Sequence, residues 1–223
     1  MRINRYVASA SQLSRRAADE AVAQGRVMVN DILATTGQPV EAQDRVTLDA
    51  TLLQPVTQFH YVLLHKPVGI VVSRRPQGND HHVYELIPHE LSRVNPVGRL
   101  DKDSSGLLLL SDDGEFVHRV SHPSAGKEKS YDITLNHPLS TLDAQRLAQG
   151  IQLTDGLSQP RLISIQANQI TVGLIEGRNR QLRRTMAALG YEVTSLHRTA
   201  FGRLKLGTLS PGAFKLLSEA PVI

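Results

Sequence analysis

Residues 98–110, which read GRLDKDSSGLLLL, constrain the fold more than any other part of the chain. The second half of this segment, residues 107–110, is an unbroken apolar run that ends at a Ser-Asp-Asp-Gly turn. A short apolar run between turns predicts a strand buried on both faces, although periodicity alone leaves a short buried helix open. The turn before the run holds Asp101 between Arg99 and Lys102. Cations keep a nearby carboxylate ionised, so Asp101 is either a candidate nucleophile or a residue that only caps the turn or pairs with Arg99.

The length and composition of the chain set outer bounds on its class. At 223 residues it can form one domain of ordinary size and a second, small one. It contains no cysteine, which excludes disulfides, thiolate nucleophiles and cysteine-ligated zinc. No apolar run approaches the length of a membrane span, and residues 1–16 lack the apolar core of a signal peptide. We therefore expect a soluble, cytoplasmic protein with no membrane partner.

The net charge of +4 is unevenly distributed along the chain. Residues 1–50 carry six Arg and six acidic residues, and five of the Arg fall within residues 1–30 against two acids. Residues 171–223 carry eight Lys and Arg against three acidic residues. Two separate basic regions suggest an extended polyanion that contacts both ends of the molecule. The alternative is that these cations belong to solvated helix faces.

The first 50 residues predict a small unit of two helices and a few strands. Ser14 is a suitable N-cap for the second helix and Gly25 follows its last turn. Short strands are predicted at 27–30, 32–34 and 46–48, with a tight turn at 30–31. Arg15 and Arg16 open the second helix, where the positive end of the helix dipole adds to their charge and favours a phosphate.

The segment 51–60 has one proline and no charged residue, which is typical of a linker. The region after it, residues 61–223, predicts a larger domain in which strands alternate with a few helices. Strands are expected at 61–64, 107–110, 130–135, 161–165 and 170–175, and helices at 114–120, 140–149 and from the N-cap Asn179 to Gly190. This strand-rich order predicts an α+β fold on an antiparallel or mixed sheet.

Three arginines, Arg180, Arg183 and Arg184, follow Asn179 at helical spacing. Guanidinium groups crowded on the first turns of one helix favour an anion and would repel one another without it. A solvated basic face is the alternative interpretation.

Three motifs together resemble a known family. Residues 98–114, the triplet Lys129-Ser130-Tyr131 and residues 176–184 look like the signature segments of the RsuA, RluB, RluE and RluF group of pseudouridine synthases. This resemblance covers the chain from about Tyr61 onward. Residues 2–49, with Ser-Arg-Arg between two helices and a Gly-x-Val-x-Val-Asn segment, resemble the small α-L RNA-binding module of a ribosomal protein. That family usually has glycine where this chain has Asp31, which tolerates left-handed geometry less well.

The resemblance implies a fold, an activity and roles for particular residues. It implies an α-L module at 1–50, a linker at 51–60 and, at 61–223, a catalytic domain with a central, mostly antiparallel mixed sheet. The reaction would be isomerisation of a uridine to pseudouridine in ribosomal RNA, without a cofactor and by a monomer. Asp101 would be the essential carboxylate, Tyr131 would stack on the flipped base, and Arg183 would pair with Asp101. The expected RNA-binding residues are Arg15, Arg16, Lys66, Arg99, Arg178, Arg180 and Arg184.

Other functions remain open from the sequence. The loop around Asp101 resembles members that act on the large ribosomal subunit, but small-subunit RNA and transfer RNA are alternatives. A noncatalytic RNA-binding protein would fit the basic regions and leave the Asp101 loop unexplained. A magnesium-dependent nuclease would use Asp101, Asp103, Asp112 and Asp113 as ligands. The adjacent His81 and His82 would face opposite ways on a strand, so we predict no metal site.

Overall fold

The computed structural model describes residues 1–11, 13–54, 56, 58–74, 78–122 and 126–223. The chain forms two compact units, Met1–Phe59 and His60–Ile223, each of which is described by itself. Within the described residues, no helix is both long and apolar enough to cross a membrane.

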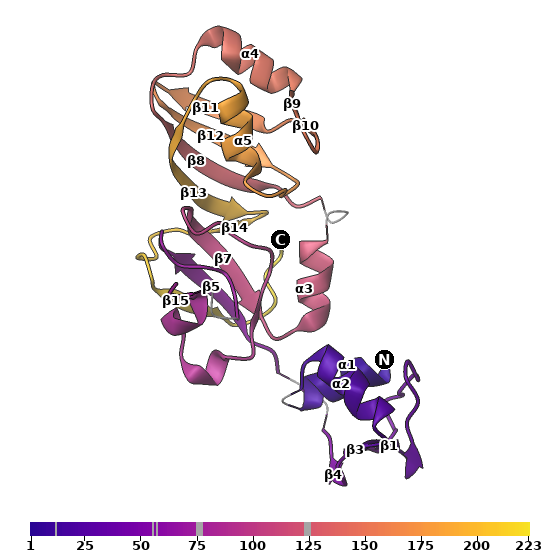
Figure 1. The fold of residues 1–223 in the computed structure, drawn as a ribbon. Coiled ribbons are helices and arrows are strands. Elements are labelled where there is room, and N and C mark those ends of the chain that lie inside the picture. The colour runs from indigo at the N-terminus through magenta and orange to yellow at the C-terminus, as the bar shows by residue number, and fades with distance from the viewer. Residues whose placement is uncertain (12, 55, 57, 75–77, 123–125) are drawn as a thin grey trace. The chain divides into compact units, whose positions relative to one another are not determined.

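The first unit packs two helices on a small antiparallel sheet (Figure 1). The helices are α1 (Ile3–Ala10) and α2 (Arg15–Ala23), and the strands, in the order β2-β1-β3-β4, are β1 (Val27–Val29), β2 (Ile32–Leu33), β3 (Val46–Leu48) and β4 (Thr51–Leu52). The predicted cap is confirmed, since the Ser14 hydroxyl accepts a hydrogen bond from the Ala17 amide at 3.2 Å. The segment that we expected to be a linker contributes β4 to this sheet and Leu53 to this core.

The turn between β1 and β2 forms without the glycine that is usual in the similar modules. Asn30 and Asp31 both have positive φ, at 52° and 63°, as a two-residue hairpin turn of type I′ requires. The Asn30 amide donates to Asp44 at 2.8 Å, and Asp31 accepts from Arg45 at 2.6 Å. These side-chain bonds offset the cost of left-handed backbone at non-glycine residues.

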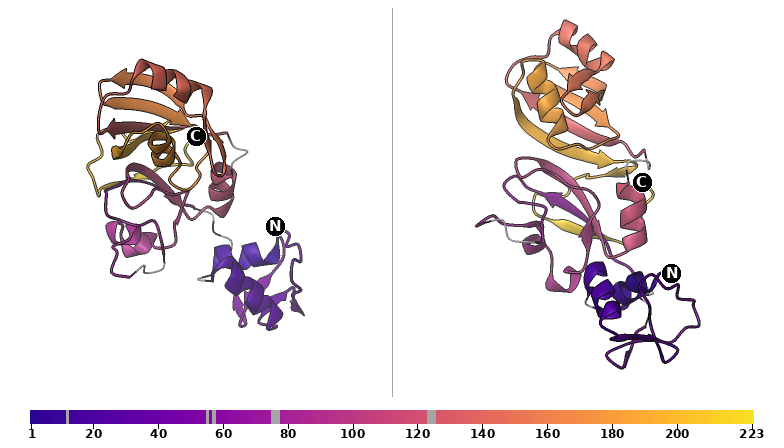
Figure 2. Two further views of the ribbon diagram at one scale, coloured as in Figure 1. Left: turned by 45° about the horizontal axis from the view of Figure 1, so that its top comes forward. Right: turned by 45° about the vertical axis from the view of Figure 1, so that its right-hand side comes forward.

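The second unit is built on one large mixed sheet (Figures 1 and 2). Its strands follow the order β11-β12-β8-β13-β7-β5-β15, with β14 on β13 and β6 on β7. Among the described strand pairs of this sheet only β7 and β13 run parallel, which confirms the predicted α+β fold with a mostly antiparallel sheet. The elements are β5 (Tyr61–Lys66), two 3₁₀ helices η1 (Val83–Leu86) and η2 (His89–Leu91), β6 (Asn95–Pro96), β7 (Ser105–Ser111), α3 (Gly114–Ser121), β8 (Lys129–Leu135), α4 (Thr141–Gln149), β9 (Ile151–Leu153), β10 (Gly156–Ser158), β11 (Arg161–Gln166), β12 (Gln169–Leu174), α5 (Gln181–Ala188), β13 (Val193–Phe201), β14 (Leu204–Lys205) and β15 (Phe214–Leu217).

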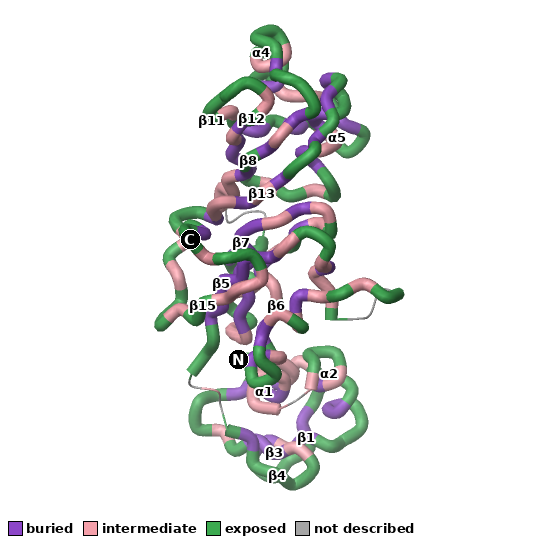
Figure 3. Tube along the Cα trace, turned by 90° about the vertical axis from the view of Figure 1, so that its left-hand side faces the viewer, coloured by how far each residue is buried: buried purple, intermediate pink, exposed green. Residues whose placement is uncertain are grey.

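The apolar run at 107–110 is the centre of strand β7 and is buried on both faces (Figure 3). Leu107 and Leu109 pack with Phe116 of α3, whereas Leu108 and Leu110 belong to a separate core that includes residues of α4 and α5. Since successive residues of a strand point to opposite faces, a strand covered on both sides needs apolar residues without alternation. The position of this run fixes where the Asp101 turn leaves the sheet.

The helix ends follow their caps, with one correction. Ser140 caps α4 by accepting from the Asp143 amide, as predicted. Asn179 is not the N-cap of α5: that residue is Arg180, in left-handed backbone with φ 46°. The reason is local, because the Gln181 side chain folds back to accept from the Arg178 amide at 3.1 Å and closes a turn before the helix begins.

Candidate active site

A cleft of about 400 Å³ lies where five segments of the second unit meet. Its walls come from the turn that precedes β7, the end of α3 with Lys127, the start of β8, the segment that joins β12 to α5, and β13. Of the residues singled out in the sequence, this cleft brings together Asp101, Tyr131, Arg99, Arg178 and Arg180. Arg183, Arg184 and Lys66 lie outside its lining, and Arg15 and Arg16 are exposed on the first unit.

Asp101 is half-buried, at the point where the turn enters the cleft. Its backbone carbonyl accepts from the Ser104 amide at 3.1 Å, which closes the turn. Its carboxylate forms no ion pair with another described residue, so the expected alternative of a pair with Arg99 is wrong. The hydrogen bonds to Asp103 raise the pKa of Arg180, and the Asp101 charge adds to that effect. An unpaired carboxylate in a cleft with cationic walls is available to a substrate.

Asp103 holds two arginines, Arg180 and Arg183. Arg180 donates both Nη atoms to its carboxylate at 2.9 and 2.7 Å. Arg183 contacts the same carboxylate through Nε at 3.2 Å and donates Nη2 to the Asp103 carbonyl at 2.7 Å. These contacts, the Arg180 bonds foremost, keep the pKa of Asp103 below its usual value. The expectation that Arg183 pairs with Asp101 is wrong for this structure, because the Arg183 guanidinium contacts Asp103 instead.

Arg178 and Arg184 share Asp155, and Arg178 also pairs with Glu176 at 3.1 Å. Arg184 donates to the Asp155 carboxylate at 3.0 and 2.8 Å, and Arg178 reaches it at 3.0 Å. Arg178 also donates to the carbonyls of Gly156 and Leu157. The predicted repulsion among Arg180, Arg183 and Arg184 is offset within the chain, because Asp103 pairs with the first two and Asp155, in the β9–β10 turn, pairs with Arg184. A turn 29 residues before Arg184 gives no sign of this pairing in the local sequence.

Lys66 was expected to bind RNA, but it has no exposed surface. Its Nζ donates to the carbonyls of Ser104 at 2.7 Å and Pro67 at 2.9 Å, and lies 3.5 Å from that of Lys102. The side chain therefore stabilises the Asp101 turn through the carbonyls of Lys102 and Ser104. Burial lowers the pKa of Lys66 to about 8, against the opposing influence of Asp103 and Asp101.

We expect Lys66 to make stability depend on pH above neutrality. The unfolded chain keeps a lysine proton up to about pH 10.4, whereas the folded chain loses it near pH 8. Between these values the unfolded state binds more protons, so the free energy of unfolding should rise with pH across that window and be insensitive to Lys66 below it. Urea unfolding at pH 7.5, 8.5 and 9.5 should give a smaller slope for Lys66→Met than for the parent. The exposed Lys215→Met is the control, and an equal slope in all three proteins would contradict the shift.

Arg198 is a site residue that the sequence analysis missed. It is 1% exposed, lies on β13 and lines the cleft. Its Nε donates to the Leu107 carbonyl at 2.7 Å and its Nη1 to the Arg99 carbonyl at 3.3 Å. A buried guanidinium between β7 and the Asp101 turn thus ties the turn to the sheet. The signal for it would have been a strand at 193–201, which its residue pattern does not show.

The geometry of the turn depends on close contact between β7 and β13. A Cβ atom on Gly106 would lie 2.2 Å from the Arg198 carbonyl oxygen, and Gly106 has φ +112°. The last glycine of the GRLDKDSSG segment is therefore required for the two strands to approach.

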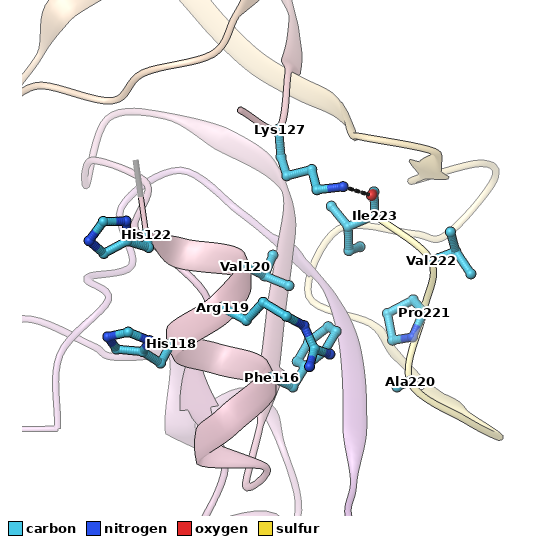
Figure 4. A pocket seen from close by; sticks show the side chains of 10 residues that line it. All are labelled: Phe116, His118, Arg119, Val120, His122, Lys127, Ala220, Pro221, Val222 and Ile223. Carbon is cyan, nitrogen blue, oxygen red and sulfur yellow. Dashed lines mark hydrogen bonds between the residues drawn. The ribbon is translucent and has the colours of Figure 1, made fainter. Parts of the chain in front are cut away.

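A second hollow, of about 740 Å³, borders the cleft (Figure 4). Val120, His122 and Lys127 line both. Its other walls are the exposed His118 and Arg119 of α3 and the segment 220–223. No Asp or Glu is among its described lining residues, and Lys127 donates Nζ to the Ile223 oxygen there.

Three of the four aspartates of the rival magnesium interpretation, Asp103, Asp112 and Asp113, have structural partners. Asp113 caps α3 and accepts from the Tyr61 hydroxyl at 2.9 Å, while Asp112 accepts from the His60 ring at 2.8 Å. His81 contacts Glu85 at 2.6 Å. Among the described residues, no three His, Asp or Glu side chains are grouped as metal ligands would be.

Comparison with known proteins agrees with this geometry. The sequence model of the family described as RNA pseudouridylate synthase matches residues 60–188, and that of the S4 domain matches residues 1–46. A protein of Aquifex aeolicus described as an uncharacterized RNA pseudouridine synthase is 34% identical, over 98% of this chain and 91% of that protein. The dual-specificity RNA pseudouridine synthase RluF of Escherichia coli is 32% identical, over 100% of this chain and 77% of its own. The ribosomal small subunit pseudouridine synthase A of Pasteurella multocida is 33% identical, over 100% and 98%.

A solved structure shares the whole fold. The crystal structure of a pseudouridylate synthase superposes with a TM-score of 0.70 at 29% identity, covering 98% of this chain and 96% of that one. The Asp101 cleft, the sequence match over more than half of the chain and the full-length relatives all agree. The chain belongs to the family of RNA pseudouridine synthases and carries an S4 domain at its N-terminus.

Proposed function

We propose that this protein isomerises a uridine of ribosomal RNA to pseudouridine, with Asp101 as the essential carboxylate. The observation that carries the proposal is the unpaired Asp101 carboxylate in a cleft that it shares with Tyr131. The lining of the cleft includes six Lys and Arg but only two acidic residues, which suits an RNA strand. A uridine inside a stacked helix could not reach Asp101, so the target base has to leave the stack.

Each group in the cleft has a part in this reaction. Asp101 acts on the ribose or the ring while ionised, without a cofactor. Tyr131, 7% exposed, offers a ring against which the detached base stays held and shielded from water. Arg183 acts as a positioning residue through Asp103, since its bonds tie α5 to the turn that carries Asp101. Arg99, Arg178 and Arg180, which line the cleft, contact phosphates of the same strand.

The N-terminal module, residues 1–50 with the connection 51–60, acts as a second RNA handle for the catalytic domain at 61–223. Arg15 and Arg16 are exposed at the start of α2, where the helix dipole favours phosphate. Exchanging both for glutamine should weaken binding of the natural RNA and lower the salt slope by about one unit per lost phosphate contact. Affinity titrations at several salt concentrations measure this. Exposed Arg203 and Lys215, both changed to glutamine, form the control, and equal slopes in the two double variants would remove the module from the RNA interface.

The target is the finer part of the proposal. The Asp-Lys-Asp-Ser loop favours large-subunit RNA, whereas one relative at 33% identity is described as acting on the small subunit. Mapping pseudouridines in all RNAs of the host, with and without the gene, tests the proposal directly. A site lost from large-subunit RNA and restored by the purified protein on that RNA alone supports it. Loss only from small-subunit or transfer RNA would move the target, and no loss anywhere would reject the function.

A further inference from the structure

The guanidinium of Arg198 has one donor without a partner. Nε and Nη1 donate to the carbonyls of Leu107 and Arg99, but Nη2 is buried and has no hydrogen-bond partner among the described residues. Arg198 also makes no ion pair with a described carboxylate. A buried charged donor that stays unsatisfied is costly, and such groups are rare in folded proteins. Nη2 therefore points to a ligand atom from outside the chain.

The surroundings of Arg198 select for negative charge. The ammonium groups of Lys66 and Lys129 are close enough for the Arg198 charge to lower the pKa of both, in addition to the larger effect of burial. Lys129 lines the same cleft and donates Nζ to the Ile175 carbonyl at 3.1 Å. A buried cation with cationic neighbours stabilises an oxygen that gains negative charge during a reaction.

The position of Arg198 indicates that the ligand atom belongs to a base held in the cleft. In the antiparallel register of β13 and β8, Arg198 lies directly opposite Tyr131, so both side chains project from the same face of the sheet, and both line the cleft. The register shifts between Arg198 and Ala200, and such irregularities re-aim side chains beside active sites. A base that stacks on Tyr131 consequently lies next to the Arg198 guanidinium.

We propose that Arg198 donates Nη2 to a carbonyl oxygen of the target uracil and stabilises the charge that collects there. This inference rests on the proposed isomerisation. When the bond between C1′ and N1 breaks, its electron pair leaves with N1 and spreads onto O2 and O4. If Asp101 instead adds to C6 first, the electrons of the C5–C6 double bond move towards O4. The new bond then forms from C5 to C1′, and any bond between the Asp101 carboxylate and C6 or C1′ breaks and frees the carboxylate. C5 loses its proton and N1 gains one, so no co-reactant is needed. Every route that is open to Asp101 places charge on a uracil oxygen.

Loss of such a donor typically slows the chemical step by about 10²–10³-fold. Arg198→Lys keeps the charge but not the planar fork that reaches two carbonyls and a ligand together. Arg198→Gln keeps a donor without the charge. Both variants should retain RNA affinity within a few-fold and lose single-turnover rate by about 100-fold or more. The control is the exposed Arg203→Gln, which should keep the parental rate.

Sulfur substitution separates this role from a structural one. RNAs with 4-thiouridine or 2-thiouridine at the target position weaken the hydrogen bond to one oxygen at a time. In the parent, sulfur at the contacted position should slow the single-turnover rate by about tenfold more than sulfur at the other position. In Arg198→Lys that difference should shrink to within about threefold, because the substitution has already removed the hydrogen bond between the guanidinium and the uracil oxygen. RNAs with a neutral methylphosphonate on either side of the target test, in the same rate measurement, whether Nη2 contacts a phosphate instead.

The outcomes either support or overturn the inference. Equal sulfur effects at the two positions in the parent would overturn it even if both variants failed to fold. An unchanged sulfur difference in Arg198→Lys would leave Arg198 as a support of the turn, and coupling to a methylphosphonate would assign Nη2 to a phosphate instead. A parent without activity on any RNA rejects the proposed function itself, whereas an active parent that fails the sulfur test rejects only the role of Arg198.

Discussion

Asp101→Asn should abolish pseudouridine formation while folding and RNA binding survive. The amide has nearly the shape of the carboxylate, and Asp101 forms no ion pair with another described residue whose loss would disturb the turn. The proposed reaction, however, loses the carboxylate of this turn that no described cation pairs with. We expect the single-turnover rate to fall by at least about four powers of ten, or roughly 5 kcal/mol of barrier, far more than one lost hydrogen bond costs.

Two neighbouring aspartates calibrate this result. Asp80→Asn removes the ion pair with Lys102 at 2.6 Å, beside Asp101, and should change the rate by less than about threefold because exposed pairs contribute little. Asp103 shares the loop with Asp101, but its contacts with Arg180 and Arg183 make it an unsuitable inert control. Asp103→Asn should give an intermediate loss, of about 10- to 100-fold. A rate for Asp101→Asn within tenfold of the parent, or equal to that of Asp103→Asn, would return Asp101 to the role of a turn residue.

The second large effect is on stability. Gly106→Ala should destabilise the catalytic unit severely, because the new Cβ would lie 2.2 Å from the Arg198 carbonyl oxygen and the backbone has φ +112°. Strain at such a backbone and overpacking each cost about 1–3 kcal/mol, so the sum is roughly 4 kcal/mol. For a chain of this size the melting temperature should fall by about 10 °C.

Gly114→Ala is the matched control for this substitution. Gly114 begins α3, has no positive φ, and a Cβ there would meet nothing within 4 Å. Thermal unfolding should place this variant within about 2 °C of the parent, since alanine is at least as favourable as glycine in a helix. If both alanine variants melted together, close approach of β7 and β13 would not be what the glycine permits.

Local signals predicted much of this fold. Ser14 and Ser140 each mark a helix start through a side-chain bond to a backbone amide, and the doubly buried β7 follows from four consecutive leucines. These features depend on residues within a few positions of one another. Strand β13 escaped prediction because its register shifts twice, between Val193 and Ser195 and between Arg198 and Ala200. The alternation that reveals a strand is broken at both places.

The positions of candidate site residues could be predicted where they lie within one short motif, but contacts between residues distant in the sequence could not. Asp101 and Tyr131 lie in the cleft as their motifs indicated. The partner of Arg183 is 80 residues away in the sequence, and the carbonyl that Arg198 holds is 91 residues away. Lys66 was predicted to bind RNA because the neighbouring sequence does not show that three carbonyls surround its ammonium group. Which distant group each of these side chains contacts is decided only when the chain packs.

The two halves of the large sheet join through a parallel register of only two described residue pairs, His197 with Ser105 and Arg198 with Gly106. Strands β5, β7 and β15 lie on one side of this seam, and β8, β11, β12 and β13 on the other. Asp101 precedes β7, whereas Tyr131 belongs to β8. Apolar substitutions on opposite sides of the seam should thus be coupled in stability, because Leu64 and Leu108 on one side share a core with Tyr131 and Ile133 on the other. Their effects on rate should not add, since the separation between carboxylate and ring is set by both halves together.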